Sequence, residues 1–270
     1  MKPFYIGIDL HGTLLNRKEE FPEKCIGNIS KLLKDMSDFL YPVTCTGNDI
    51  SFVQKKLPSS IFSQMKGHVL ETGCTFGTVS ENSNGTISVT EKILVSDEIV
   101  QKRNNLEKLI KDHSFKEITR VGRRLATVSL FTDFPEKFSR KITSFIDKYK
   151  YLDEFSVTWS SVAVDIVPKS FDKLKGLKIA AKNNDIIGVA DSVNDIPLLK
   201  GADYSFSPSN IAIVAENTLR KSGMKIVQID DSLISLEKAT LYKANYEDAK
   251  GVEEILLLLK KLMPRYTNNQ

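Results

Sequence analysis

The stretch FYIGIDLHGTLL, residues 4–15, decides the fold that the sequence predicts. Its first five residues are apolar, which favours a buried strand over 4–8 that ends at Asp9. The pattern that follows predicts an amphipathic helix over 23–40, a strand over 41–45, a helix over 49–57 and a strand over 68–71. Strands that alternate with helices in this way indicate a parallel sheet with helices packed against it.

The middle of the chain has a different pattern. Strands over 75–80 and 86–90 flank Asn84-Gly85, a pair typical of tight hairpin turns because both residues accept a positive φ. We expect a helix over 96–112, strands over 115–121 and 125–131, a helix over 135–149, and strands over 155–159 and 162–167. This order is that of an α+β unit in which most strands are antiparallel.

The alternation of helix and strand returns in the last third. The pattern predicts helices over 171–182, 195–201, 211–222 and 252–262, with strands over 185–190 and 204–206. The predicted fold is therefore an α/β core with a doubly wound, Rossmann-like parallel sheet, formed by residues 1–79 and 168–270. An α+β cap domain is expected as an insert at 80–167.

Composition excludes several classes of protein. The chain of 270 residues has 38 Lys and Arg against 34 Asp and Glu, a bias too weak to indicate a nucleic-acid partner. Its longest aliphatic run, at 255–259, is far shorter than the roughly 20 residues that span a bilayer. The N-terminus lacks a secretory apolar segment. Cys25, Cys45 and Cys74 have no metal-binding spacing and are typical of reduced thiols in a cytoplasmic protein.

Polar residues follow three of the predicted core strands. Asp9, Thr46 and Asp191 stand at these strand ends, and Asp195 lies four residues beyond Asp191. Ligands bind beyond the carboxyl ends of strands in open α/β sheets, so these side chains are expected to share one crevice. Three carboxylates repel one another unless a cation lies between them, and oxygen ligands favour Mg²⁺ over Zn²⁺. A bound Mg²⁺ would in turn accept a phosphate oxygen as a ligand.

Several of these residues have simpler interpretations. Any single Asp or Thr at a strand end is often only a helix cap or a loop residue, and their joint placement is what favours a site. The basic cluster in the insert could either contact a second anionic group of a substrate or lie on a solvated hairpin; it consists of Arg120, Arg123 and Arg124. Trp159 could line a pocket or fill the core of the insert. His68 and His113 stand alone, so structural roles are expected.

Four segments resemble the motifs of one known family, in the correct order. DLHGTLL at 9–15 is similar to the DxDGT motif of the haloacid dehalogenase (HAD) superfamily of phosphatases, and TCTGN at 44–48 to its second motif. DIVP at 165–168 with FDK at 171–173 resembles the third, and ADSVND at 190–195 resembles the fourth, GDxxND. A cap between the second and third motifs is typical of the Cof-type subclass IIB. This subclass includes sugar-phosphate phosphatases and archaeal phosphoglycolate phosphatases.

The resemblance implies roles for individual residues. Asp9 would be the nucleophile that forms an aspartyl-phosphate. Mg²⁺ would be bound by Asp9, the backbone carbonyl of His11 and Asp191, with Asp195 at or near the metal. The groups that would hold the phosphoryl group are Thr46, Gly47, Asn48, Lys173 and Asn194. Lys169 and Lys175 are rivals of Lys173, which the eight-residue interval from Asp165 favours.

Two of the positions that depart from the family pattern bear on the chemistry. His11 stands where the family has the Asp that protonates the leaving alkoxide and later activates water. Imidazolium can donate such a proton near neutral pH, and neutral imidazole can accept one, so the resemblance implies His11 as a catalytic acid and base. Asn48 stands where many relatives have Arg, as in the archaeal phosphoglycolate phosphatase branch.

The function that the resemblance implies is a Mg²⁺-dependent phosphatase. Its substrate would be a small phosphorylated metabolite, such as a sugar phosphate or a phosphoglycolate-like compound. A phosphotransferase or mutase is one alternative, and a non-catalytic protein that binds a phosphorylated ligand is another, because His11 replaces the usual Asp. We expect a monomer or homodimer with no nucleic-acid or membrane partner.

Overall fold

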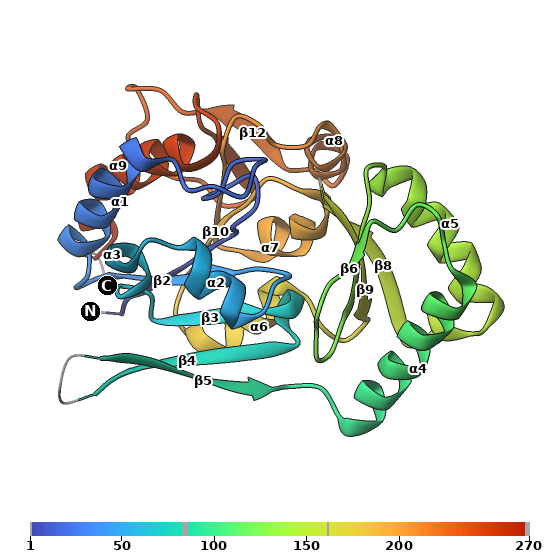
Figure 1. Cartoon of the computed structure of the whole chain (residues 1–270). Coiled ribbons are helices and arrows are strands. Elements are labelled where there is room, and N and C mark those ends of the chain that lie inside the picture. The colour runs from blue at the N-terminus through green and yellow to red at the C-terminus, as the bar shows by residue number, and fades with distance from the viewer. Residues whose placement is uncertain (1, 83–85, 161, 268–270) are drawn as a thin grey trace.

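The strands of the chain form two separate sheets (Figure 1). The structure is a computed structural model that describes residues 2–82, 86–160 and 162–267. Within these residues one sheet has nine strands and the other four. In order across the larger sheet, the strands are β12 (Lys225–Gln228), β13 (Thr240–Lys243), β11 (Tyr204–Ser207), β10 (Ile186–Val189), β1 (Phe4–Ile8), β2 (Leu40–Cys45), β3 (Gly67–Leu70), β4 (Thr75–Glu81) and β5 (Ile87–Ile93).

The larger sheet is mostly parallel and has helices on both faces. Its first seven strands in that order run parallel, whereas β4 and β5 are antiparallel additions at one edge. One face is covered by α1 (Glu23–Asp35), α2 (Ile50–Lys56), α3 (Ser59–Phe62) and α9 (Asp248–Thr267). The other face is covered by α6 (Lys173–Ala181), α7 (Ile196–Gly201) and α8 (Ile213–Lys221). The predicted doubly wound core is therefore confirmed.

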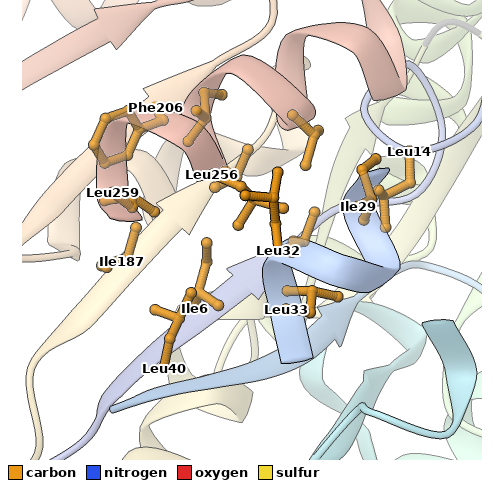
Figure 2. Close-up of a cluster of buried hydrophobic side chains, with 14 of the residues drawn as sticks. Ile6, Leu14, Ile29, Leu32, Leu33, Leu40, Ile187, Phe206, Leu256 and Leu259 are labelled. Atoms are coloured by element: carbon orange, nitrogen blue, oxygen red, sulfur yellow. The ribbon is translucent and has the colours of Figure 1, made fainter. Parts of the chain in front are cut away.

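Aliphatic side chains fill the space between the sheet and its helices. Figure 2 shows Ile6 and Ile187 of the sheet facing Leu32 of α1 and Leu256 and Leu259 of α9. All five are fully or almost fully buried. Burial of a large aliphatic side chain stabilises a fold by about 1.5–3 kcal/mol, so this layer holds the central strands in fixed positions. The residues that follow β1 and β10 are thereby held in place as well.

The smaller sheet is antiparallel and is covered by helices on one face. Its order is β6 (Arg120–Val121), β7 (Val128–Phe131), β9 (Ala163–Pro168) and β8 (Phe155–Trp159). The helices α4 (Asp97–His113) and α5 (Pro135–Lys148) pack against it through a separate apolar core. In Figure 1 they lie on the side of this sheet that faces away from the larger one. Short 3₁₀ turns lie between other elements: η1 (Glu71–Gly73), η2 (Tyr151–Asp153) and η3 (Val193–Asp195).

The structure corrects the sequence-based predictions at several elements. The second hairpin strand, predicted at 86–90 as part of the insert, is β5, which pairs with β4 along seven residue pairs and so extends the larger sheet. The strand predicted over 115–121 forms only as β6, because Phe115 turns into the apolar core beneath α4 and α5. The strands β12 and β13 and the helix α3 were not predicted. The turn predicted at Asn84-Gly85 lies outside the described residues.

Two further expectations concern the whole chain. Among the described residues, no helix has both the length and the apolar character that crossing a membrane requires. All three cysteines are free and buried. Burial raises the pKa of the Cys45 and Cys74 thiols, which therefore stay protonated and unreactive at neutral pH.

His68 is a buried titratable group in β3. A hydrogen bond of 2.8 Å joins its Nδ1 to Thr44 Oγ1, and its ring stacks on Phe62 with 5.0 Å between ring centres. Its Nε2 has no hydrogen-bond partner among the described residues. Burial lowers the pKa of His68 to about 4, so the folded protein keeps this ring neutral in mildly acidic solution.

We predict that His68 makes the fold sensitive to mild acid. Below about pH 6.5 the unfolded chain binds a proton that the folded chain excludes until about pH 4, so stability falls as the pH drops through this window. Between pH 7 and pH 5 the loss should be about 2 kcal/mol. Urea unfolding at both pH values should show that, from pH 7 to pH 5, wild type and His113→Asn lose about 2 kcal/mol relative to His68→Asn, because the other titrating groups, such as Asp9, contribute alike in all three proteins. The same pH dependence in all three proteins would contradict the prediction.

Candidate active site

Three neighbouring strands of the larger sheet end at the same edge. The order β10, β1, β2 places the residues that follow them, Asp191, Asp9 and Thr46, side by side. The Asp9 amide donates to Val189 O at 2.9 Å, and the Thr46 amide donates to Val69 O at 2.9 Å. The backbone hydrogen bonds of the sheet thus continue up to the side chains that were expected to converge.

Lys173 joins the carboxylates that follow β1 and β10. Its Nζ lies 2.7 Å from Asp9 Oδ1 and 2.5 Å from Asp195 Oδ1, and only 1% of its side chain is exposed. Burial lowers the pKa of Lys173, but Asp195 and Asp9 more than offset this and leave the pKa above its usual value. The ammonium group is therefore a permanent positive charge between two buried carboxylates.

Asp9, Asp191 and Asp195 form a buried carboxylate cluster. One oxygen from each lies within 4.8 Å of the others. Burial, opposed mainly by Lys173, raises the pKa of Asp9 to about 6, and burial together with Asp9 and Asp195 raises the pKa of Asp191 well above its usual value. Lys173 alone does not balance three negative charges. A divalent cation with a preference for oxygen ligands fits this set, whereas Zn²⁺ would favour His or Cys.

The loop after β1 packs tightly against Asp191. Gly12 has φ +73°, and a Cβ there would lie 2.2 Å from Asp191 Oδ2, so glycine is required both for its conformation and for space. Thr13 Oγ1 donates to Asp191 Oδ1 at 3.2 Å, and Asn210 Nδ2 donates to Gly12 O at 2.7 Å. This loop therefore fixes the position of Asp191 relative to Asp9.

Asp195 is held from the other side by a capping box. Ser192 donates to Asp195 Oδ2 from its Oγ at 2.8 Å and from its backbone amide at 3.3 Å. Ser192 Oγ also contacts Asn194 Oδ1. Both Asp195 oxygens thus have partners, one in the N-cap residue of η3 and the other in Lys173.

His11 has a polar partner at each ring nitrogen. Its Nε2 lies 3.3 Å from Glu19 Oε1, and its Nδ1 lies 3.3 Å from Asn48 Nδ2. The hydrogen bond with His11 lowers the pKa of Glu19, which stays ionised. Phe52 of α2 packs against the imidazole with 5.1 Å between ring centres. The amide of Asn48 can only donate at Nδ2, so the neutral ring accepts at Nδ1 and donates from Nε2 to Glu19.

The two sheets enclose a small cavity over the strand ends. The larger sheet and its loops contribute Asp9, His11, Thr46, Gly47, Asn48, Lys173, Ser192 and Asn194. The smaller sheet and its loops contribute Arg124, Ser129, Phe131, Ser160, Val162, Ala163 and Asp165. The volume of this cavity, which is partly open to solvent, is 30 Å³, and this is room for about two water molecules. In this arrangement the second sheet closes over the polar edge of the first.

The structure brings together all the site residues that the sequence predicted. Seven of them line this cavity, Asp191 lines an adjoining groove, and Asp195 is fully buried against Lys173. The rival lysines, Lys169 and Lys175, are exposed.

Sequence reasoning missed part of the cavity wall. Ser129 and Asp165 are paired across β7 and β9, and Ser129 Oγ donates to Asp165 Oδ1 at 2.5 Å. Two polar side chains at facing positions of apolar strands were the available signal. Glu19, eight residues after His11, gave no signal of its own because polar residues are ordinary in loops.

Comparisons with known proteins agree with this geometry. Residues 53–212 match the family model of the haloacid dehalogenase-like hydrolases. A phosphoglycolate phosphatase from Methanopyrus kandleri is 21% identical over 208 residues, which are 75% of this chain and 82% of that protein. Protein 0175 of Thermoplasma acidophilum has a similar fold, with TM-score 0.63 and 18% identity, over 97% of this chain and 100% of its own. So does the sucrose-phosphatase of Synechocystis sp. PCC6803, solved with sucrose and phosphate, with TM-score 0.62, 13% identity and coverage of 96% and 99%.

We predict that the Lys173 charge is needed for stability. Lys173→Met would leave Asp9 and Asp195 buried without their counter-ion, which should lower the free energy of unfolding by about 3–5 kcal/mol. The matched control is Lys175→Met, two residues along the same helix, where the side chain is exposed and the change should be within about 0.5 kcal/mol. Urea unfolding in EDTA at neutral pH gives both values, and equal stability of the two variants would refute the prediction.

Proposed function

The chain belongs to the haloacid dehalogenase-like hydrolases, and from this premise we propose that it is a Mg²⁺-dependent phosphatase of small phosphorylated metabolites. The observation that carries this proposal is the Asp9 carboxylate, held by buried Lys173 beside two further carboxylates in a cavity lined by Thr46 and Asn48. The similarity to a protein named phosphoglycolate phosphatase supports a small substrate.

In the proposed reaction Asp9 is the nucleophile. A carboxylate oxygen of Asp9 forms a bond to phosphorus while the bond from phosphorus to the leaving oxygen breaks. Lys173 and Thr46 contact the transferring phosphoryl group and offset its charge, assisted by Gly47, Asn48 and Asn194. Asp9, Asp191, Asp195 and the backbone carbonyl of His11 would hold Mg²⁺, which supplies positive charge to the phosphoryl oxygens.

His11 is the proposed acid and base. When protonated at Nδ1, the ring would give up its contact with Asn48 Nδ2 and donate this proton to the leaving alkoxide in the first step, while its Nε2–H stays bonded to Glu19. In the second step water attacks the phosphorus of the aspartyl-phosphate and gives a proton back to Nδ1. Phosphate is released and the Asp9 carboxylate is restored. The Glu19 contact supports this role because it orients the ring and assists the charged form.

Residues 97–168 would act as the cap. Their sheet supplies one wall of the cavity, and the closed cavity has room for very little water. Closure of this kind excludes bulk water while the intermediate forms and restricts the leaving group. We propose that this segment, which begins after β5, is the functional part of the insert.

We predict Mg²⁺-dependent phosphate release from a panel of phosphate esters. The panel consists of 2-phosphoglycolate, glycerol 3-phosphate, glucose 6-phosphate and an aryl phosphate. EDTA should abolish release and Mg²⁺ should restore it, because the carboxylates of the cluster repel one another and the phosphate without a cation. Asp9→Asn should lower the rate by several orders of magnitude while thermal unfolding still shows a folded protein.

Other outcomes of this panel point to the alternatives. Transfer of the phosphoryl group to an added alcohol or sugar, with little free phosphate, would indicate a phosphotransferase or mutase. Binding of the esters and Mg²⁺ without turnover would indicate a protein that only binds a phosphorylated ligand. Full activity in EDTA would refute the assignment of the metal.

We predict that the effect of removing His11 depends on the leaving group. His11→Ala should slow hydrolysis of a sugar phosphate roughly 10²–10⁴-fold, the usual contribution of general acid–base catalysis. The kcat/KM for an aryl phosphate should change little, since it reports the first step and an aryl leaving group hardly needs a proton. His113→Ala, at the exposed end of α4, is the control. Equal rates of wild type and His11→Ala on the sugar phosphate, with faster turnover by His11→Asp, would show that His11 is not catalytic.

A further inference from the structure

A second, basic cavity adjoins the catalytic one. It has a volume of 340 Å³ and lies between α2 and the segment 120–124 next to the smaller sheet. It shares Asn48 and Arg124 with the catalytic cavity. Its cationic lining residues are Lys55, Lys56, Arg120, Arg123 and Arg124. This excess of positive charge next to the proposed phosphate site indicates an anionic ligand.

The two carboxylates of this cavity already have partners. Glu19 contacts His11 and lies 3.6 Å from Lys56 Nζ. Asp49 caps α2 by accepting the Phe52 amide at 2.9 Å and lies 3.5 Å from Arg124. These two groups pair with Lys56 and Arg124. Among the described residues, no ion pair is formed by the other three cations, Lys55, Arg120 and Arg123.

Arg124 is the buried member of the basic group. Only 7% of its side chain is exposed, and it donates to Asn48 Oδ1 at 2.5 Å and to Arg123 O at 2.9 Å. Its Nε is buried without a hydrogen-bond partner among the described residues. Burial lowers the pKa of Arg124, against the opposing charges of Asp165, Glu71 and Asp49, yet the only ion pair that it makes among the described residues is the 3.5 Å contact with Asp49. A buried guanidinium whose ion pair is this long is costly, and an anion in the cavities that Arg124 lines would offset its charge.

The buried carboxylate of Glu71, in the η1 turn after β3, fixes the backbone next to Arg124. Glu71 Oε1 accepts the Leu125 amide at 2.8 Å, and Glu71 Oε2 accepts the Ala126 and Thr127 amides at 2.7 and 3.2 Å. These bonds fix the segment directly after Arg124, so the guanidinium is held over the catalytic cavity.

The arrangement also limits the size of the ligand. Asn48 bridges the two parts of the site, because its Nδ2 lies 3.2 Å from Thr46 Oγ1 while its Oδ1 lies 2.5 Å from Arg124 Nη2. One side-chain amide thus separates the proposed phosphate-binding hydroxyl from the guanidinium. A molecule that reaches both needs only one or two carbon atoms between its phosphate and its second anionic group.

We propose that Arg124 binds a carboxylate of the substrate and that the substrates are short phosphorylated hydroxy acids. This inference rests on the proposed phosphatase function and names its substrate class. A planar guanidinium matches a carboxylate in shape and charge, and the exposed cations around it would favour the approach of a ligand that carries both a phosphate and a carboxylate. Phosphate esters that lack the carboxylate would leave Arg124 unsatisfied and would therefore bind more weakly.

The first test measures binding without turnover. In Mg²⁺, isothermal titration compares 3-phosphonopropionate with propylphosphonate, which cannot be hydrolysed and differ chiefly in the carboxylate. Wild type and Arg140→Gln, a control on the exposed face of α5, should bind the acid at least tenfold more tightly. Arg124→Gln should reduce this preference to about twofold or less. No preference in wild type, or an unchanged preference in Arg124→Gln, would overturn the proposal.

The second test separates this inference from the proposed function. Phosphate release from 2-phosphoglycolate and 2-hydroxyethyl phosphate gives kcat/KM for an acid and its uncharged counterpart. Arg124→Gln should raise KM for the acid at least tenfold more than it raises KM for the uncharged ester. Equal kcat/KM for both esters in wild type would overturn the carboxylate site and leave the phosphatase intact. A carboxylate preference in binding, with no release from any ester, would support the site and refute the phosphatase.

Discussion

The ammonium group of Lys173 is the contact on which the candidate site depends. It touches Asp9, at the end of the first strand, and Asp195, which is more than 180 residues further along the chain. Three carboxylates in this small volume could not all ionise without it, because each additional charge raises the pKa of the others. The lysine therefore binds the two parts of the core to each other as well as preparing the site. The three carboxylates carry more negative charge than Lys173 balances, and this excess is what makes a divalent cation fit.

One strained turn of the backbone lies next to this contact. Glu71 and Thr72 both have positive φ, 47° and 57°, which is costly for residues other than glycine. Their amides donate to Asn48 O at 3.1 Å and Thr46 O at 3.0 Å, so the strained turn holds the loop after β2. Gly73 continues the turn with φ +91°, where a Cβ would lie 2.1 Å from Asp172 O. One turn thus positions Thr46, the segment after Arg124 and the start of the helix that carries Lys173.

The sequence was sufficient to predict the core and its polar strand ends, but not the surface of the smaller sheet that faces those strand ends. The strands at 4–8 and 155–159 were predicted to the residue, because compact apolar runs end sharply at polar residues or turns. The first helix was predicted to reach residue 40, since Met36 and Leu40 continue its apolar period, yet the chain turns after Asp35. The short edge strand β12 (KIVQ) is half exposed and depends on pairing with β13, which no local pattern reveals. The contact between Arg124 and Asn48 likewise arises only when the two sheets meet.

Asn48 shows why this site uses residues that differ from the family pattern. Its Nδ2 has two hydrogens, which reach Thr46 Oγ1 and His11 Nδ1, and its Oδ1 accepts from Arg124. Only a side chain that both donates and accepts can join these three groups. An aspartate would offer no donor to the imidazole, and an arginine would place a second guanidinium against Arg124. The histidine at 11, the amide at 48 and Arg124 are therefore one interdependent set, in which the segment before β7 supplies a positive charge that the loop after β2 lacks.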